Sequence, residues 1–328
     1  MFKIGSENIG EAPLFLAPME DITDRSFRYI CKKYGADVLT TEFVASEAII
    51  RNVPSALKKM EFEEWERPIG IQIYGHQVDV MIEAAKIVAS YNPNFIEINA
   101  GCPVRKIATR GAGAGLLLDI PKLIQIAEGI VKAVEPIPVS VKTRLGWDEN
   151  SIVIDTLVEQ LQYTGIQFIT IHARTRNQFY KGKAQWQYIK TITSNPNVNI
   201  QIVGNGDISS PEIARDRLIN YGVDALMIGR AAIGRPYIFR EIKYFLQNGE
   251  KLPQLDINEI VEIAKEHFLK SLEIKGEPRG IYEMRRHFSL YFKGLPNFKP
   301  LRQKLVTSLN PNEILQILEY IREKYTSL

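Results

Sequence analysis

Cysteine and histidine are scarce in this chain of 328 residues, which contains two cysteines and four histidines. The two cysteines, Cys31 and Cys102, cannot form the disulfide network that stabilises small secreted proteins. The histidines lie far apart along the chain, so the spacing of a zinc site is missing as well. We therefore expect neither a disulfide framework nor a metal site.

Long hydrophobic runs and a strong charge of one sign are also missing. No apolar run reaches the ~18–20 residues that a membrane span requires. The first ten residues include Lys3 and Glu7 and lack the apolar segment of a secretory signal. Hydrophobic residues make up 45% and charged residues 24%, which excludes intrinsic disorder. We expect a soluble cytoplasmic protein that has no association with membranes.

The sequence does contain a repeated alternation of short apolar runs with helical segments. The runs are rich in β-branched residues, which is typical of parallel strands buried on both faces. The segments 78–90, 122–134, 152–163 and 211–221 have helical periodicity. Eight such units in about 240 residues predict a closed (β/α)8 TIM barrel of the α/β class, with a doubly wound open sheet as the alternative. The predicted strands are residues 14–17, 38–41, 69–73, 95–99, 139–142, 168–172, 200–204 and 225–228.

The pattern changes in the last quarter of the chain. Residues 247–256 have the composition of a turn or linker, and residues 256–328 show helical periodicity without a convincing strand. Asp256 or Asn258 can cap the first helix, while residues 276–278 and 294–297 interrupt the pattern. We predict a barrel domain over residues 1–246 and a small all-α helical domain over residues 255–328.

Most of the predicted strands end on polar residues or glycine at the same end. In a TIM barrel this end carries the active site, and the loops after the last two strands commonly bind phosphate. Here those loops contain Gly204-Asn205-Gly206 and Gly229-Arg230. Glycine lets backbone N–H groups approach an anion closely, and arginine can donate two hydrogen bonds to a phosphate. The sequence therefore predicts a phosphate site after the seventh and eighth strands.

Three further polar residues end or interrupt buried strands. Lys142 ends the fifth strand, where an unpaired ammonium would be costly and an anionic ligand would be a suitable partner. Gln72 and His172 offer hydrogen-bond donors and acceptors to the same cavity. This set suits a flavin mononucleotide, with Gln72 and Lys142 at the ring edge and His172 and Arg230 near the phosphate. A sugar phosphate would fit the same residue types.

The two cysteines receive different interpretations. Cys102 follows the fourth strand in the sequence Gly101-Cys102-Pro103, where a thiol can act as a proton donor or a nucleophile or simply fill space. Cys31 lies in a helical stretch and is expected to be a core residue. The glycine-rich segment 111–115 does not follow a strand directly, so we interpret it as a flexible or tightly packed turn before a helix rather than as a dinucleotide site.

Basic residues cluster locally although the net charge is only +3. Residues 172–183 contain four basic residues and no acid, and residues 279–304 contain seven basic residues and Glu283 as the single acid. Two basic stretches in a nearly neutral chain indicate a surface that faces a polyanion, although a solvated surface would also explain either stretch alone.

As an ordered set, these motifs resemble the tRNA-dihydrouridine synthase family, and the tail motif Met284-Arg285-Arg286-His287 is most like the bacterial type-B branch. The resemblance covers residues 12–240 and the tail. Its motifs are, in chain order, Ala17-Pro18-Met19, Thr23-Asp24, Phe27-Arg28, Ile71-Gln72-Ile73, residues 96–103 (IEINAGCP), Val141-Lys142-Thr143-Arg144, His172-Ala173-Arg174-Thr175-Arg176, Asn205-Gly206-Asp207-Ile208 and Ile228-Gly229-Arg230.

The resemblance implies a flavin enzyme that reduces the C5–C6 double bond of particular uridines in tRNA. In this family NADPH reduces FMN, the reduced flavin delivers hydride to C6, and the motif cysteine, here Cys102, protonates C5. The helical domain helps to bind tRNA. The implied FMN contacts are Pro18, Met19, Glu20, Gln72, Lys142, His172, Asn205, Gly206, Asp207, Gly229 and Arg230. The implied contacts with the uridine or the tRNA backbone are Asn99, Lys106, Arg174, Arg176, Arg285 and Arg286.

Two alternatives remain open. The protein could instead be a flavin barrel that acts on a free pyrimidine or another small molecule, as dihydroorotate dehydrogenases do. Such an enzyme would not need a basic helical tail. A barrel without activity could serve as an RNA-binding protein, and it would then bind no flavin. We expect a monomer without an obligate protein partner; the sequence does not indicate which uridine is reduced or whether NADPH is preferred over NADH.

Overall fold

The computed structural model describes residues 1–326 and contains a closed barrel of parallel strands. The strands follow the order β3-β11-β10-β9-β8-β7-β6-β4, and a parallel bridge between Phe15 and Val38 joins the two ends of the sheet. This closure confirms the predicted TIM barrel and excludes the open sheet. The barrel strands are β3 (Leu14–Leu16), β4 (Leu39–Thr40), β6 (Ile69–Tyr74), β7 (Phe95–Ala100), β8 (Val139–Arg144), β9 (Phe168–His172), β10 (Gln201–Asn205) and β11 (Ala225–Ile228).

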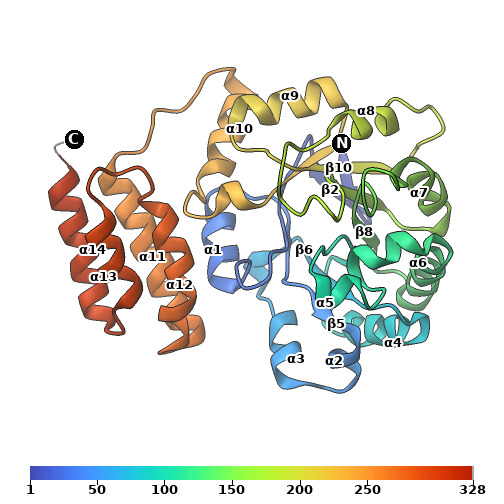
Figure 1. The fold of residues 1–328 in the computed structure, drawn as a ribbon, viewed down its shortest axis with the longest axis horizontal. Coiled ribbons are helices and arrows are strands. Elements are labelled where there is room, and N and C mark those ends of the chain that lie inside the picture. Colours follow the sequence, from blue (N-terminus) through green and yellow to red (C-terminus); the bar gives the residue numbers. More distant parts are fainter. Residues whose placement is uncertain (327–328) are drawn as a thin grey trace.

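Helices surround the barrel (Figure 1). The four helical segments predicted from periodicity correspond to α4, α6, α7 and α9, with α7 continuing as a short 3-10 helix over Gln162–Thr164. No helix within residues 1–326 is both long and apolar enough to cross a membrane. The helices of the barrel are α1 (Arg25–Lys33), α2 (Ser46–Ile50), α3 (Pro54–Met60), α4 (Val78–Ala89), α5 (Arg105–Ala108), α6 (Ile120–Val134), α7 (Ile154–Leu161), α8 (Gln187–Thr193), α9 (Pro211–Tyr221) and α10 (Ile238–Asn248).

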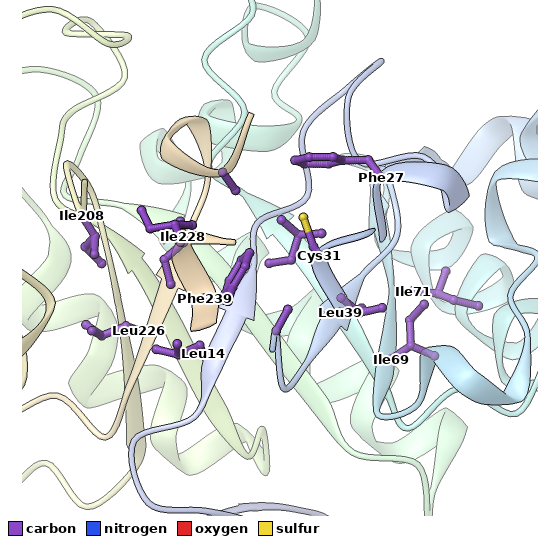
Figure 2. Close-up of a cluster of buried hydrophobic side chains, with 14 of the residues drawn as sticks. Leu14, Phe27, Cys31, Leu39, Ile69, Ile71, Ile208, Leu226, Ile228 and Phe239 are labelled. Atoms are coloured by element: carbon purple, nitrogen blue, oxygen red, sulfur yellow. The ribbon is translucent and has the colours of Figure 1, made fainter. Parts of the chain in front are cut away.

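The outward faces of the strands pack against these helices. Figure 2 shows Phe27 and Cys31 of α1 and Phe239 of α10 near the strand residues Leu14 and Leu39. All five side chains are fully buried. Cys31 is therefore a core residue, as predicted.

An N-terminal hairpin, which was not predicted from the sequence, lies at the amino-terminal ends of the barrel strands. It consists of β1 (Phe2–Ile4) and β2 (Glu7–Gly10). The Phe2 ring packs edge-on against Phe15 and Phe168, and Phe168 in turn packs against Phe95. A β-carbon at Gly70 would lie 2.2 Å from the Phe95 ring, so glycine is needed there. This aromatic layer, which consists of Phe2, Phe15, Phe95 and Phe168, fills the amino-terminal end of the barrel. The opposite end is left for polar residues. A short strand, β5 (Val44–Ala45), was also not predicted.

The last four helices lie beside the barrel, next to α1 (Figure 1). Asp256 caps the first of them through the Glu259 N–H, and both predicted interruptions separate consecutive helices. Gly234 packs so closely on α12 that a β-carbon there would lie 2.5 Å from the Leu290 carbonyl carbon. The predicted all-α tail is thus confirmed. Its helices are α11 (Ile257–Lys275), α12 (Arg279–Tyr291), α13 (Lys299–Thr307) and α14 (Pro311–Tyr325).

Candidate active site

A cavity of about 630 Å³ opens at the carboxyl ends of the barrel strands. This volume is in the range of sites that hold a cofactor or a drug-sized ligand. The cavity brings together all the residues predicted to hold the cofactor, as well as Asn99 and Cys102. The predicted residues that line it are Pro18, Met19, Glu20, Gln72, Asn99, Cys102, Lys142, His172, Asn205, Gly206, Asp207, Gly229 and Arg230.

Cys102 lies in the wall of this cavity and is held by its backbone. The Asn99 Oδ1 atom accepts hydrogen bonds from the Gly101 and Cys102 N–H groups at 3.0 and 2.9 Å, and the Cys102 carbonyl accepts one from the Ala114 N–H at 3.1 Å. Burial raises the pKa of the thiol, although the Val104 N–H partly opposes this. A thiol with a raised pKa stays protonated at neutral pH, which suits a proton donor better than a nucleophile.

The glycine-rich segment 111–115 supports the Cys102 loop. Gly113 has a φ of +55°, and a β-carbon there would lie 2.9 Å from the Cys102 β-carbon. The segment leads into a 3-10 helix over Gly113–Leu118 and then into α6. Of the two forms expected from the sequence, a flexible or a tightly packed turn, the structure shows the packed one.

Lys142 and His172 supply polar groups of different charge. Burial lowers the pKa of Lys142, and the carboxylate of Glu97 opposes this and favours the ammonium. Burial and the neighbouring cations lower the pKa of His172, so this imidazole is neutral at pH 7. The Lys142 Nζ atom has one acceptor among the described residues, Asn205 Oδ1 at 3.4 Å. An ammonium has three N–H donors, so Lys142 can also donate to a ligand in the cavity.

Arg230 and Asp207 form the end of the cavity predicted to bind phosphate. The Arg230 guanidinium lies 4.7 Å from the centre of the Tyr180 ring and 3.3 Å from a carboxylate oxygen of Asp207. A β-carbon at Gly206 would lie 3.3 Å from the His172 ring and 3.0 Å from the Ala184 β-carbon, and its φ is +128°. Glycine therefore allows the backbone to approach the cavity here.

Arg174 contacts residues of the cavity lining without lining the cavity itself. The side chain was expected to contact substrate, yet it is 1% exposed and does not line the cavity. Its guanidinium donates to the Lys181 and Gly182 carbonyls at 3.2 and 2.7 Å and to Asp207 at 2.7 Å. Through these contacts Arg174 holds the loop after β9 against Asp207.

Arg144 and Glu97, to which no role was assigned from the sequence, also shape the site. Arg144 donates to the Gly101 carbonyl at 2.8 Å and to the Thr175 and Phe179 carbonyls at 3.0 and 2.9 Å, so it ties the Cys102 loop to the loop after β9. Glu97 is buried in β7 opposite Gln72 of β6 and accepts a hydrogen bond from it. A charged residue inside an apolar strand was the available signal for Glu97, and the position of Arg144 at a strand end was the signal for that residue.

The other predicted RNA contacts lie outside the cavity. Lys106 is exposed on α5, and Arg176 stacks on the Trp147 ring at 4.5 Å. On α12, Arg285 stacks on the Tyr282 ring at 4.7 Å, while Arg286 reaches a barrel loop at Asp21. The structure therefore places these cations on several different elements around the barrel and the tail.

One group of carboxylates among the described residues is close enough to hold a metal ion, namely Glu20, Asp21 and Glu42. Each already has a partner in the protein. Glu20 pairs with Lys59 at 2.6 Å, Asp21 with Arg286 at 3.2 Å, and Glu42 accepts from the Asp21 N–H at 2.5 Å. The Glu20 carboxylate, which was predicted to contact the cofactor, is therefore held in an ion pair at the cavity.

Residues 15–326 match the family model described as dihydrouridine synthase (Dus). The chain belongs to the dihydrouridine synthase family. This match covers both the barrel and the helical tail, and it confirms the resemblance predicted from the motifs.

Relatives of this dihydrouridine synthase family member match over most of their length. A protein of Rickettsia conorii named "Probable tRNA-dihydrouridine synthase" is 35% identical over 329 residues, which is all of this chain and 97% of the relative. A protein of Pseudomonas aeruginosa named "tRNA-dihydrouridine synthase B" is 38% identical over 292 residues, or 88% of this chain and 86% of the relative. The second name supports the resemblance to the type-B branch.

Solved structures that are similar to this dihydrouridine synthase family member share its fold at low sequence identity. The 6-hydroxypseudooxynicotine amine oxidase of Pseudomonas geniculata has a TM-score of 0.59 and 11% identity, covering 98% of this chain and 66% of that one. A 2-naphthoyl-CoA reductase has a TM-score of 0.58 and 12% identity, covering 74% of this chain and 51% of that one. At such identities the similarity supports the barrel fold alone.

Proposed function

We propose that this protein is a tRNA-dihydrouridine synthase that binds FMN, is reduced by NADPH, and reduces the C5–C6 double bond of specific uridines in tRNA. The observation that carries the proposal is that one cavity holds the protonated thiol of Cys102, the ammonium of Lys142 and the Arg230 side chain expected at the phosphate. The chain that forms this cavity belongs to the dihydrouridine synthase family. The names of its relatives, which refer to tRNA-dihydrouridine synthase, agree with it.

The residues present fit FMN along the length of the cavity. At one end the Lys142 ammonium has donors to spare, and Gln72 lines the same cavity, as the ring edge of a flavin requires. The His172 ring lies close to Gly206 and belongs to the phosphate end. At the other end Gly206 and Gly229 expose backbone and Arg230 supplies a cation, as a phosphate requires. Asp207 is the exception, since a carboxylate would repel a phosphate; its pairing with Arg174 and Arg230 offsets that charge.

When bound, the flavin supplies the hydride for C6 of the uridine. Cys102 supplies the proton for C5 from a thiol that burial keeps protonated. Asn99 fixes the backbone of Cys102, and Arg144 fixes the preceding carbonyl of Gly101. The protein thus contributes orientation and a proton at a defined atom.

A uridine in folded tRNA must leave its stack to reach such a cavity. Positive charge beside the opening would hold the RNA backbone while the base is extruded. We assign this role to Lys106, Arg176, Arg285 and Arg286, and we propose the helical domain of residues 255–328 as the second tRNA-binding unit beside the FMN-binding barrel of residues 1–246. We also propose a cytoplasmic monomer that needs no protein partner, which analytical ultracentrifugation would test.

The test is a visible absorption spectrum of the purified protein under anaerobic conditions. A flavin band that NADPH bleaches and that returns only on addition of unmodified tRNA supports the proposal, and mass spectrometry of the tRNA then identifies the reduced position. Release of the flavin and its mass distinguish FMN from other flavins. A flavin absorption band that returns on addition of a free pyrimidine but not of tRNA would overturn the proposal in favour of the small-molecule enzyme.

A further inference from the structure

Strand β7 carries a carboxylate inside the barrel that the proposed function does not use. Glu97 is 0% exposed and lies between Phe95 of the aromatic layer and Asn99 of the cavity wall. Alternate residues of a strand face the same side, so these three side chains point into the barrel. Glu97 occupies the level between the apolar bottom of the barrel and the cavity.

A chain of directed hydrogen bonds connects Glu97 to Cys102. The Gln72 Nε2 atom donates to Glu97 at 2.5 Å, and the Asn99 Nδ2 atom donates to the Gln72 Oε1 atom at 2.7 Å. The Asn99 Oδ1 atom then accepts from the Cys102 N–H at 2.9 Å. The first two links run from β7 to β6 and back to β7, and the last joins Asn99 to the loop that follows β7.

The two ends of this chain determine the orientation of both amides. An ionised carboxylate only accepts hydrogen bonds, so Gln72 must present its NH₂ group to Glu97. A backbone N–H only donates, so Asn99 must present its oxygen to Cys102. The two constraints agree at the central link, where the Asn99 NH₂ group meets the Gln72 oxygen. An amide flip at either residue would place like groups against each other.

The charge of Glu97 also has a counterpart. Burial raises the pKa of Glu97 to about 7, and the Lys142 ammonium limits this rise in favour of the carboxylate. The Thr170 hydroxyl lies 3.5 Å from its second oxygen. A buried carboxylate is costly, and a hydrocarbon side chain would fill a purely structural position at lower cost.

We propose that Glu97 is a positioning residue that orients Gln72 and Asn99, and through Asn99 holds the Cys102 backbone at the cavity. The part of this role that concerns Gln72 and a bound flavin rests on the proposed function. The part that concerns Cys102 does not, because it can be measured without turnover.

The experiment compares Glu97→Met, which removes the acceptor at similar size, with Glu97→Gln, which keeps one. Ser140→Ala is the matched control, since Ser140 is buried on a neighbouring strand and its hydroxyl has no partner among the described residues. Alkylation of the purified full-length protein by iodoacetamide is followed by peptide mass spectrometry, which reports Cys102 and Cys31 separately. Cys31 reports global unfolding, because it is fully buried in the core.

We expect Cys102 in Glu97→Met to be alkylated about tenfold faster, the factor expected for loss of a hydrogen bond to a charged group. The alkylation rate of Cys31 should be unchanged in Glu97→Met, and the alkylation rate of Cys102 should be unchanged in Ser140→Ala. In Glu97→Gln the Asn99 end still directs Gln72 to present its NH₂ group, so the rate should stay within about threefold of the starting protein. The release rate of the bound flavin should follow the same order.

An unchanged Cys102 rate in Glu97→Met, or equal acceleration in Glu97→Met and Glu97→Gln, would overturn the proposal. Should Glu97→Met fail to fold, Gln72→Met severs the same chain at the next link and carries the test with the same expected rates. If the protein holds no flavin, the proposed function fails, while the alkylation rates still decide the role of Glu97.

Discussion

Arg286 of α12 donates to the carbonyl oxygen of Asp21 at 2.9 Å and to its carboxylate at 3.2 Å, which links the helical tail to the loop after β3. The preceding residues of that loop, Pro18, Met19 and Glu20, line the cavity. Asp21 itself has a φ of +56°. A side chain of the tail is therefore in direct contact with the rim of the candidate active site.

We predict that Arg286→Ala weakens tRNA binding more than it weakens the fold. Both side chains of the pair are more than half exposed, so the lost ion pair should lower the free energy of unfolding by less than about 1 kcal/mol. Because Arg286→Ala removes one phosphate contact, the slope of the logarithm of the tRNA association constant against the logarithm of salt concentration should become shallower by about 1. Fluorescence titration of tRNA at several salt concentrations measures this slope. Lys132→Ala, at the opposite end of the barrel, should leave it unchanged.

The raised pKa of Cys102 predicts the pH dependence of its chemistry. The protonated thiol is the acid, so its role is complete below the pKa and is lost as the pH rises through it. Since burial raises this pKa, the loss should begin above the ordinary thiol value of about 8.5. Alkylation of Cys102 at a series of pH values, read by peptide mass spectrometry, measures the same ionisation. A midpoint below 8.5 would contradict the assignment as proton donor.

Cys102→Ala separates the two halves of the proposed reaction. Reduction of the flavin by NADPH should proceed at an unchanged rate, because the thiol takes no part in it. Reoxidation by tRNA should slow by about 10²–10⁴-fold, the usual contribution of a positioned acid. Anaerobic stopped-flow absorbance measures both steps, and tRNA-dependent reoxidation at the original rate would show that another group supplies the proton.

Arg230→Ala is expected to weaken FMN binding about 10- to 100-fold. The variant removes the cation of the loop after β11 that lines the cavity and leaves Asp207 with less compensation beside the phosphate. Arg240→Ala on α10 is the matched control, since this arginine stacks on Tyr34 and does not line the cavity. Quenching of FMN fluorescence gives both dissociation constants. Equal values for the two variants would place the phosphate elsewhere.

The contact between barrel and tail should depend on a buried ion pair. Lys275 at the end of α11 lies 2.5 Å from Asp24, the N-cap of α1, and 2.7 Å from Glu283. Lys275→Met leaves the buried Asp24 without its cation, while Glu283 keeps Arg279 at 2.7 Å, and the substitution should lower the free energy of unfolding by about 3 kcal/mol. Lys251→Met, at an exposed position, should cost less than about 0.5 kcal/mol. Urea unfolding at pH 7 measures both values.

The same pair has a predictable response to acid. Burial alone would raise the pKa of Asp24, but Lys275, together with His287 and the Ser26 hydroxyl, outweighs it and holds that pKa below its usual range. A carboxyl group whose pKa is lowered by folding stabilises the protein above its unfolded pKa of about 3.9 and loses this contribution as the pH falls. The difference in stability between the original protein and Lys275→Met should therefore narrow below pH 3.9. A constant difference down to pH 2 would contradict the pairing.

Much of the architecture was readable from the order of residues alone. The apolar runs overlap all eight barrel strands, and the polar residues at their ends converge on one cavity because parallel strands in a closed barrel all end on the same face. The capping residue Asp256 and the interruptions at 276–278 and 294–297 placed the tail helices for a similar local reason. Such features depend on neighbours in the chain, which the sequence displays directly.

Other features depend on which strands become neighbours and in what register, so only the tertiary structure decided them. Glu97 becomes the partner of Gln72 because β6 and β7 pair with these residues opposite each other. Arg174 turns inward because Asp207 and the carbonyls at 181 and 182 surround its guanidinium, whereas a basic residue after a strand reads equally well as a surface cation. Sequence determined which residues reach the end of the barrel; the packing between strands decided which of them face the cavity and which hold the others in place.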